Sequence, residues 1–439
     1  VADSGDLQID VVTQFTGYEH EQDKSQVTRL FLNGEPVDSL SAGDQGIVVL
    51  DQTPFYAESG GQVGDRGMLR KGENTFSVSD TRKQGAGAFI HIGELVQGCI
   101  STGDQFEAIV DHGRRSATRM NHSATHLMHA ALRETLGEHV QQKGSLVDPE
   151  RLRFDFSHFQ PVSEQELGRI EARVNEQIRA NANVETRVMP VDQAMEAGAM
   201  ALFGEKYGDE VRVLSIGKFS VELCGGTHVS RAGDIGLFKI VSEAGIASGV
   251  RRIEAVTGSG ALAHINETEK NLTEVAGLVK SVSEDVVGKV NQLLERNRKL
   301  EKELDTLKAK LASSQGSDLT GQAMEIEGIK VLAAYLEGAD AKGLRETVDQ
   351  LKNKLGAAAV ILAAVEGKKI ALVAGVTKAE TTRIKAGELV NHVASQIGGR
   401  GGGRPDMAQA GGSQPENLEA ALASVGDWVK QQLAAAGSA

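Results

Sequence analysis

The sequence is poor in cysteine and has no long apolar run. Only two of its 439 residues are cysteines, Cys99 and Cys224, so a disulfide scaffold is excluded and a reducing cytoplasm is the expected setting. No apolar run approaches the roughly 18 residues that a membrane span needs, which excludes an integral membrane protein. The chain opens without Met, a basic start or an apolar segment. We therefore expect no secretory signal, and we interpret this start as a cut inside a longer polypeptide.

Positive charge is also scarce, and the formal net charge is −13. This argues against a chain that holds nucleic acid by charge alone, because neutralising phosphates needs local lysine and arginine. Residues 262–439 carry 22 lysines and arginines against 23 aspartates and glutamates, so 12 of the 13 excess negative charges lie in residues 1–261. The C-terminal part is therefore the less repulsive surface for a polyanion.

The length and the local patterns predict a multi-domain α+β protein, since a chain of 439 residues exceeds one domain of ~150 residues. Short, regularly spaced strands in residues 1–112 predict a small β-barrel or sandwich, of which we choose the barrel. Residues 113–260 alternate helices and strands and predict an α+β domain, with a helix over about 114–136. Ser163 with Glu166 three residues later is a capping-box signal for a second helix, running to about Ala180. Residues 261–316 have a helical pattern. Continuous apolar runs between helices in residues 317–439 predict an α/β domain whose strands are buried on both faces.

The helical segment carries a coiled-coil seam. Apolar residues recur every seven positions in two interleaved series, with Asn297 at one core position. The seam consists of Val286, Val290, Leu293, Asn297, Leu300, Leu304, Leu307 and Leu311. Two interpretations compete: an antiparallel hairpin with residues 261–282, slightly favoured because only about three heptads are available, and a zipper that would support a homodimer through residues 261–439.

Four side chains have the identities and spacing of a zinc site. His122 and His126 are four residues apart on the predicted helix, so both imidazoles project from one face. Cys224 precedes His228 by four residues, and two glycines between them allow a tight turn. A thiolate and three imidazoles form a tetrahedral set that suits Zn²⁺.

Other interpretations of these residues stay open. Either pair alone is weak evidence, because two histidines on a helix are more often exposed and a lone cysteine is usually a small core residue. A zincin protease is disfavoured, since Ser123 stands where its general-base glutamate would follow the first histidine. A purely structural zinc site with all four ligands filled remains an alternative. His129, three residues past His126, could lie behind the metal ligands or be merely exposed, and the exposed interpretation is favoured.

Several motifs together resemble the alanyl-tRNA synthetase family. Four segments resemble the editing domain of that family and its free-standing deacylase relatives. They are HSATHLMHAAL (122–132), QQKGS (141–145), ALFGEKYGDEVRV (201–213) and CGGTHV (224–229). FYAESGGQVGDRG (55–67) resembles the preceding barrel, and GGRGGGRPDMAQAGG (398–412) is similar to the signature of the C-terminal domain, which is related to a module of DHH-type phosphoesterases. Threonyl-tRNA synthetases share the editing motifs but not these last two blocks.

The resemblance implies proofreading: hydrolysis of the ester in tRNA(Ala) wrongly charged with serine or glycine. A synthetic site sized for alanine cannot strongly exclude these two, so a second hydrolytic sieve is useful. The resemblance further implies that Zn²⁺ is held by the four residues named above, and that Gln142 and Gln62 act with Cys224 at the catalytic site. Zinc would either activate water at an open ligand position or only position the substrate.

Contacts with tRNA are expected from two regions. Arg114, Arg115 and Arg119 precede the metal-binding residues on the helix, where a solvated face is the commoner explanation and contact with acceptor phosphates the second. In the glycine-rich segment, Arg404 and Gln409 are candidate contacts, and shape must carry part of the recognition because basic residues are not in excess.

No ATP-binding or amino-acid-activating segment is found in the sequence. The resemblance places the aminoacylation domain of the same polypeptide before residue 1, so no ligase activity is expected from this chain alone. Three hypotheses remain: the C-terminal half of an alanyl-tRNA synthetase, a free-standing long deacylase, and a non-catalytic module for tRNA binding and dimerisation with structural zinc. The missing Met favours the first over the second.

Overall fold

The computed structural model describes residues 9–85, 87–196 and 209–436. It divides into two compact units, residues 1–272 and 273–439. The first unit contains both the predicted barrel and the predicted editing domain. Of the quoted segment 201–213, residues 201–208 lie outside the described residues. None of the helices that the structure describes is both long and apolar enough to cross a membrane.

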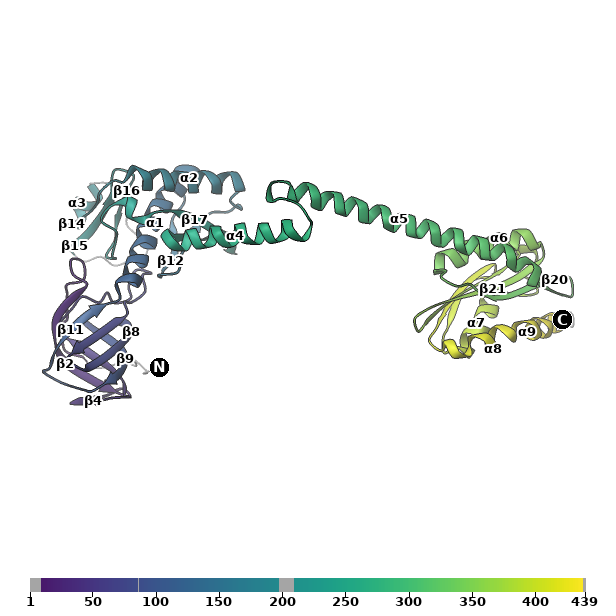
Figure 1. Ribbon diagram of the computed structural model, residues 1–439, viewed down its shortest axis with the longest axis horizontal. Coiled ribbons are helices and arrows are strands. Elements are labelled where there is room, and N and C mark those ends of the chain that lie inside the picture. Colours follow the sequence, from purple (N-terminus) through teal and green to yellow (C-terminus); the bar gives the residue numbers. More distant parts are fainter. Residues whose placement is uncertain (1–8, 86, 197–208, 437–439) are drawn as a thin grey trace. The chain divides into compact units, whose positions relative to one another are not determined.

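A closed antiparallel barrel opens the first unit (Figure 1). In spatial order its six strands are β11 (Gln105–Val110), β7 (Gly67–Lys71), β8 (Asn74–Gln84), β9 (Ala88–Gln97), β5 (Gln45–Leu50) and β2 (Gln22–Leu32), and β2 pairs back to β11. Short strands accompany them: β1 (Gln14–Phe15), β3 (Glu35–Val37), β4 (Ser39–Ser41), β6 (Gln52–Thr53) and β10 (Cys99–Ser101). All six barrel strands contribute to one apolar cluster that includes the buried Phe76 and Phe106. The predicted β-barrel is confirmed.

A long helix, α1 (His112–Leu136), follows the barrel directly. Asp111 caps its N-terminus by accepting a hydrogen bond from the backbone N–H of Arg114. The predicted capping box is present before α2 (Glu164–Ala180), where Ser163 and Glu166 satisfy each other's backbone N–H groups. Both helices contribute apolar residues to one core, which they share with the neighbouring four-stranded sheet.

Two antiparallel sheets complete the first unit. The four-stranded sheet has the order β12 (Gln142–Val147), β13 (Leu152–Ser157), β18 (Val250–Thr257) and β17 (Phe238–Ala247). The three-stranded sheet has the order β14 (Val184–Pro190), β15 (Glu210–Ile216) and β16 (Ser220–Leu223), with the short helix α3 (Val191–Glu196) after β14. The turn after β16 carries two of the candidate metal ligands.

The predicted helical segment forms α4 (Gly258–Leu278) and α5 (Val286–Leu319). The seam leucines of α5 whose side chains are described are 41–64% exposed: Leu293, Leu300, Leu304 and Leu307. The described residues of the second unit therefore leave this apolar stripe largely uncovered, and neither the hairpin nor the zipper is confirmed.

The second unit ends in a six-stranded sheet between helices. The order is β19 (Met324–Ile326), β20 (Ile329–Tyr335), β21 (Ala358–Glu366), β22 (Lys369–Val376), β24 (Met407–Gly412) and β23 (Gly401–Arg404), and only β20 and β21 pair in parallel. The helices are α6 (Ala341–Leu355), α7 (Ala386–Gln396), α8 (Leu418–Ala423) and α9 (Val425–Ala436). Successive residues of β21 enter two different apolar cores, one shared with α6 and the other with α7 to α9. The prediction of strands buried on both faces is confirmed.

Candidate metal centre

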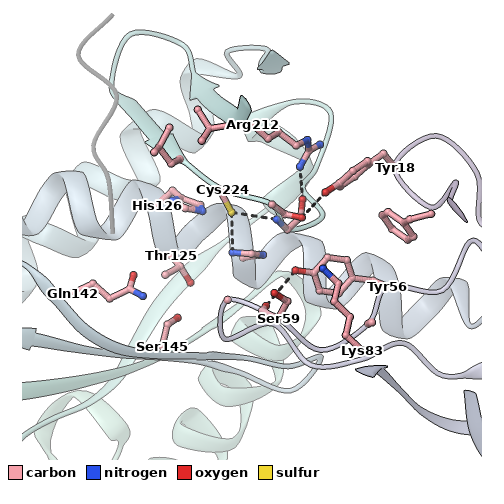
Figure 2. A pocket seen from close by; sticks show the side chains of 18 of the residues that line it. Tyr18, Tyr56, Ser59, Lys83, Thr125, His126, Gln142, Ser145, Arg212 and Cys224 are labelled. Carbon is pink, nitrogen blue, oxygen red and sulfur yellow. Dashed lines mark hydrogen bonds between the residues drawn. The ribbon is translucent and has the colours of Figure 1, made fainter. Parts of the chain in front are cut away.

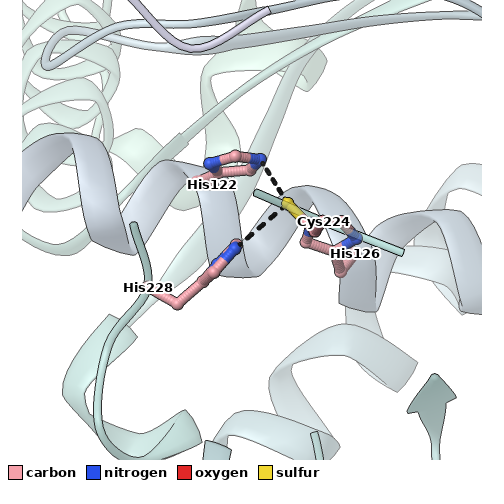
Figure 3. Close-up of side chains that lie close together, drawn as sticks. All are labelled: His122, His126, Cys224 and His228. Carbon is pink, nitrogen blue, oxygen red and sulfur yellow. Dashed lines mark hydrogen bonds between the residues drawn. The ribbon is translucent and has the colours of Figure 1, made fainter. Parts of the chain in front are cut away.

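The four predicted zinc ligands converge in the first unit. Helix α1 supplies His122 and His126, and the turn after β16 supplies Cys224 and His228 (Figure 3). One ligand atom from each residue lies within 4.8 Å of the others. The Sγ of Cys224 is 3.5 Å from Nε2 of His122 and 3.3 Å from Nε2 of His228. Ligands around a tetrahedral zinc ion are separated by about 3.5 Å, given metal–ligand bonds of ~2.0–2.3 Å.

The turn that carries Cys224 and His228 needs glycine for a specific reason. A Cβ on Gly226 would overlap the imidazole ring of His122, whereas a Cβ on Gly225 would meet only the hydroxyl of Tyr18, at 4.0 Å. Neither glycine has a positive φ. Gly226 is therefore required for the close approach of the backbone to His122, rather than for the tight turn that the sequence suggested.

Each of the three histidines has a hydrogen-bond partner at Nδ1, which leaves Nε2 free for a metal. The Nδ1–H of His122 donates to Oε1 of Gln62 at 2.8 Å, and that of His126 donates to Oε2 of Glu222 at 2.8 Å. His228 Nδ1 lies 3.2 Å from Oγ of Ser123. Oxygen acceptors at Nδ1 fix the tautomer whose Nε2 lone pair can coordinate a cation.

The burial of His126 gives a separate test of the metal assignment. Its Nε2 is buried and has no hydrogen-bond partner among the described residues. Burying such a nitrogen without a partner costs free energy. A metal ion bonded to this Nε2 would satisfy it, so the residues present fit a bound zinc ion.

The charges around Cys224 and His228 also favour metal binding. Burial raises the pKa of the Cys224 thiol, but the surrounding imidazoles more than offset this and hold it well below its usual range. Burial lowers the pKa of His228 to about 3, which keeps this imidazole neutral. A thiolate and a neutral imidazole are the protonation states in which these groups bind metals.

Glu222 is a functional residue that the sequence analysis missed. It is 2% exposed and accepts hydrogen bonds from His126 and, at 3.1 Å, from Nδ1 of His129. Burial raises the pKa of this carboxyl, but the two histidines lower it by more than burial raises it. The resulting pKa is about 2. His129 is itself 2% exposed, so its interpretation as an exposed residue was wrong. A glutamate inside the short apolar strand before Cys224 was the available signal.

A pocket of about 310 Å³ lies beside the metal ligands (Figure 2). His126 and Cys224 face it together with polar side chains from α1 and β12, namely Thr125, Gln142 and Ser145. Gln142, which the resemblance assigns to the catalytic site, therefore lines the same pocket as His126 and Cys224, and its catalytic role stays a prediction. The opposite wall comes from the barrel.

Gln62 does not line this pocket. It is fully buried, its Oε1 also accepts the backbone N–H of Thr227 at 2.9 Å, and its Nε2 donates to Oγ1 of Thr227 at 2.9 Å. The barrel thus brings Gln62 to the site from behind His122. We correct its predicted catalytic contact to a positioning role, because its amide orients His122 and cannot touch a substrate in the pocket.

The structure also corrects one of the predicted tRNA contacts. Arg115 is completely buried, where it forms an ion pair with Asp65 and donates to the carbonyl oxygens of Gly17 at 2.8 Å and Pro54 at 2.7 Å. Its guanidinium joins α1 to the barrel and is enclosed by protein. The prediction that it contacts RNA was wrong.

The other predicted RNA contacts differ in exposure. The Arg119 side chain is 21% exposed and pairs with Glu21, and the Arg114 side chain is 34% exposed. In the second unit, the Arg404 side chain is 71% exposed and Gln409 is exposed on β24. Arg404 and Gln409 therefore remain available to a ligand.

Comparison with known proteins places these segments in families. Three family models match: "tRNA synthetases class II (A)" over residues 3–114, "Threonyl and Alanyl tRNA synthetase second additional domain" over residues 211–254, and "DHHA1 domain" over residues 328–431. A solved structure, the C-Ala domain of alanyl-tRNA synthetase from Aquifex aeolicus, is 28% identical with a TM-score of 0.23 and covers 25% of this chain and 96% of its own.

Curated relatives match almost the whole chain. The alanine–tRNA ligase of Methylococcus capsulatus is 57% identical over 98% of this chain and 50% of its own length. That of Nitrosococcus oceani is 58% identical over 98% of this chain and 49% of its own length. The chain thus spans about half the length of the curated relatives it matches. As the motifs predict, it is homologous to the C-terminal half of alanyl-tRNA synthetases.

Proposed function

We propose that this chain is an aminoacyl-tRNA ester hydrolase that removes serine or glycine wrongly attached to tRNA(Ala), with Zn²⁺ at the site. The observation that carries the proposal is the convergence of four metal-binding atoms within 4.8 Å on the wall of a 310 Å³ pocket. A site with only a structural metal would need no such pocket beside its ligands.

The residues around the pocket suggest how it could act. His122, His126, Cys224 and His228 would hold the zinc ion. When bound, zinc supplies a Lewis acid that can polarise an ester carbonyl or lower the pKa of a bound water molecule. Gln142, by resemblance a substrate neighbour, carries an amide that can orient the aminoacyl group through hydrogen bonds.

The polar wall also suggests why the site would accept serine and reject alanine, a distinction that does not extend to glycine, which has no hydroxyl. The amide of Gln142 and the hydroxyls of Thr125 and Ser145 reach the pocket. A site that hydrogen-bonds a substrate hydroxyl rejects an analogue lacking it, because its own polar groups are then left unpaired. Serine can satisfy such groups and alanine cannot.

One alternative is a non-catalytic tRNA-binding and dimerisation module with structural zinc. The specific observation in its favour is that four protein ligands fill a tetrahedral coordination sphere. The exposed leucine seam of α5 supports the homodimer through residues 261–439.

We further infer that the chain acts with an aminoacylation domain of the same polypeptide, because the relatives are about twice its length. A free-standing long deacylase is the other form in which the same hydrolysis could occur. A reducing cytoplasm suits both, since Cys99 and Cys224 are both free thiols. Arg114, Arg119, Arg404 and Gln409 are the proposed contacts to tRNA(Ala).

The decisive experiment uses the zinc-loaded chain with Ser-tRNA(Ala), Gly-tRNA(Ala) and Ala-tRNA(Ala). We expect release of serine and glycine, and much slower release of alanine. Chelation of the metal or Cys224→Ala should stop serine release, whereas Cys99→Ala should not, because Cys99 is exposed in the barrel. Serine release that survives both chelation and Cys224→Ala would refute a zinc-dependent site, and the absence of serine release from the zinc-loaded chain would favour the non-catalytic module.

A further inference from the structure

The barrel side of the pocket is an aromatic wall. It consists of Phe15, Tyr18, Tyr56 and Phe89, all of which line the pocket. The ring of Phe15 lies at its centre, with centroids 4.8 Å from Tyr18, 5.9 Å from Tyr56 and 5.8 Å from Phe89. Tyr18 is 43% exposed and Phe15 is half-buried, so the wall offers ring surface to a ligand.

Two cations stand beside this aromatic wall. The guanidinium of Arg212 lies 3.7 Å from the ring centroid of Tyr18, and the ammonium of Lys83 lies 5.6 Å from that of Phe89. Both residues line the pocket, and Lys83 is exposed (Figure 2). Glu210 also lines the pocket, so the two cations lie on its aromatic side together with one carboxylate elsewhere in the lining.

The aromatic wall is tied to the turn that carries the metal ligands. The hydroxyl of Tyr18 donates to the carbonyl of Gly225 at 2.6 Å, and Nη1 of Arg212 donates to the carbonyl of Gly226 at 2.6 Å. Gly225 and Gly226 lie between Cys224 and His228 in the sequence. A ligand that contacts the rings therefore has a fixed position relative to the metal-binding atoms.

We propose that the aromatic wall binds the terminal adenosine of the tRNA, with Phe15 and Tyr18 against the adenine and Lys83 near its 5′ phosphate. This inference rests on the proposed function. The scissile ester is attached to the ribose of that nucleoside, so a pocket that places the ester beside the metal must accommodate the adenosine next to it. Stacking on aromatic rings binds any base through its π-face, and a lysine meets the phosphate.

The pocket would then divide its substrate between two structural parts. The polar residues Gln142 and Ser145 of β12 face the aminoacyl group, and the barrel faces the nucleoside. Recognition of the adenosine is common to all tRNAs, so the barrel would contribute affinity and orientation without selecting the amino acid.

The test measures binding of two non-hydrolysable probes to the zinc-loaded full chain by calorimetry. One is 3′-deoxy-3′-(L-serylamino)adenosine, and the other is the same compound without the adenine. We expect the adenine to tighten binding to the unmodified protein by roughly 5- to 100-fold, as base–aromatic stacking provides. Phe15→Ala should remove most of this gain and leave the affinity for the probe without adenine unchanged.

Further variants separate the loss of the ring from misfolding and test the contact of Lys83 with the phosphate. Phe15→Leu retains an apolar side chain without a ring and should also lose the gain, with the zinc content unchanged. Lys83→Ala should weaken the binding of the seryl probe that additionally carries a 5′ phosphate. It should leave the binding of the two probes without phosphate unchanged. Lys71→Ala is its matched control, since Lys71 is a barrel lysine paired with Asp104.

Each remaining outcome overturns the inference in a distinguishable way. An adenine contribution that is equal in the unmodified protein and in Phe15→Ala refutes the aromatic wall while leaving serine release intact. Adenosine monophosphate binding as tightly as the seryl probe would indicate a site for free nucleotides instead. If neither probe binds and serine is not released, both the inference and the proposed function fail.

Discussion

Replacing Glu222 by glutamine tests whether the carboxylate behind His126 controls the metal centre. Its two oxygens accept Nδ1–H groups from His126 at 2.8 Å and His129 at 3.1 Å. A glutamine has one acceptor oxygen, so its NH₂ group would face one of these N–H groups. When His126 switches tautomer to relieve this conflict, its Nε2 carries the proton and cannot coordinate zinc.

The expected magnitude follows from the role of such partners. Removing a group that orients a metal-binding histidine typically weakens the metal ~10- to 100-fold, or about 1.4–2.8 kcal/mol. We expect this loss in Glu222→Gln, measured by competition with a chromophoric chelator at neutral pH. Circular dichroism of the metal-free protein should show that the fold is retained.

A matched control is available in the same unit. Glu243 has a side chain that is 8% exposed and pairs with Arg251, and it is not among the metal-binding residues. Glu243→Gln should therefore leave zinc affinity unchanged. Equal zinc affinity in Glu222→Gln and the unmodified chain would refute the reasoning, and so would an equal loss in both variants.

Three further predictions concern stability. Arg115→Met should cost about 3–5 kcal/mol in urea denaturation, because it leaves Asp65 buried without its cation; adding Asp65→Asn should recover part of this loss, and no recovery would contradict the ion-pair explanation. Burial lowers the pKa of His91 to about 4, below its ordinary value of 6.5. Protons therefore bind the unfolded chain preferentially, and stability should fall as the pH drops from about 6.5 toward 4. We expect a loss of about 2 kcal/mol between pH 7.5 and 5, and a pH dependence unchanged in His91→Gln would refute this. Zinc at a concentration 1,000-fold above its Kd should stabilise the first unit by up to ~4 kcal/mol. Chelation should therefore lower the calorimetric unfolding temperature of the first unit and leave that of the second unit unchanged. Equal shifts in both units would contradict the placement of the metal.

Local patterns in the sequence were sufficient for the elements and for the metal ligands. Strand periodicity predicted the barrel, and Ser163 with Glu166 predicted the start of α2. The four ligands could be identified because their spacing is set by local geometry: one helical turn separates His122 from His126, and one short turn separates Cys224 from His228.

Long-range packing accounts for what the sequence did not reveal. Arg115 appears in the sequence as one of several basic residues, and only the adjacent barrel shows that it is enclosed around Asp65. His129 lies three residues after His126, so it shares a face with the metal ligands and points inward. A motif located Gln62 near the site but could not show that His122 stands between it and the pocket.

The contact of Gln62 with His122 has a consequence for how the proposed activity could be moved between proteins. A graft of residues 113–260 would carry all four donors to zinc, yet it would lose the barrel residue that orients one of them. It would also leave Arg115 without the acceptors it finds in the barrel. The smallest part of the chain that retains all these contacts is therefore the barrel together with the helix and sheets that follow it.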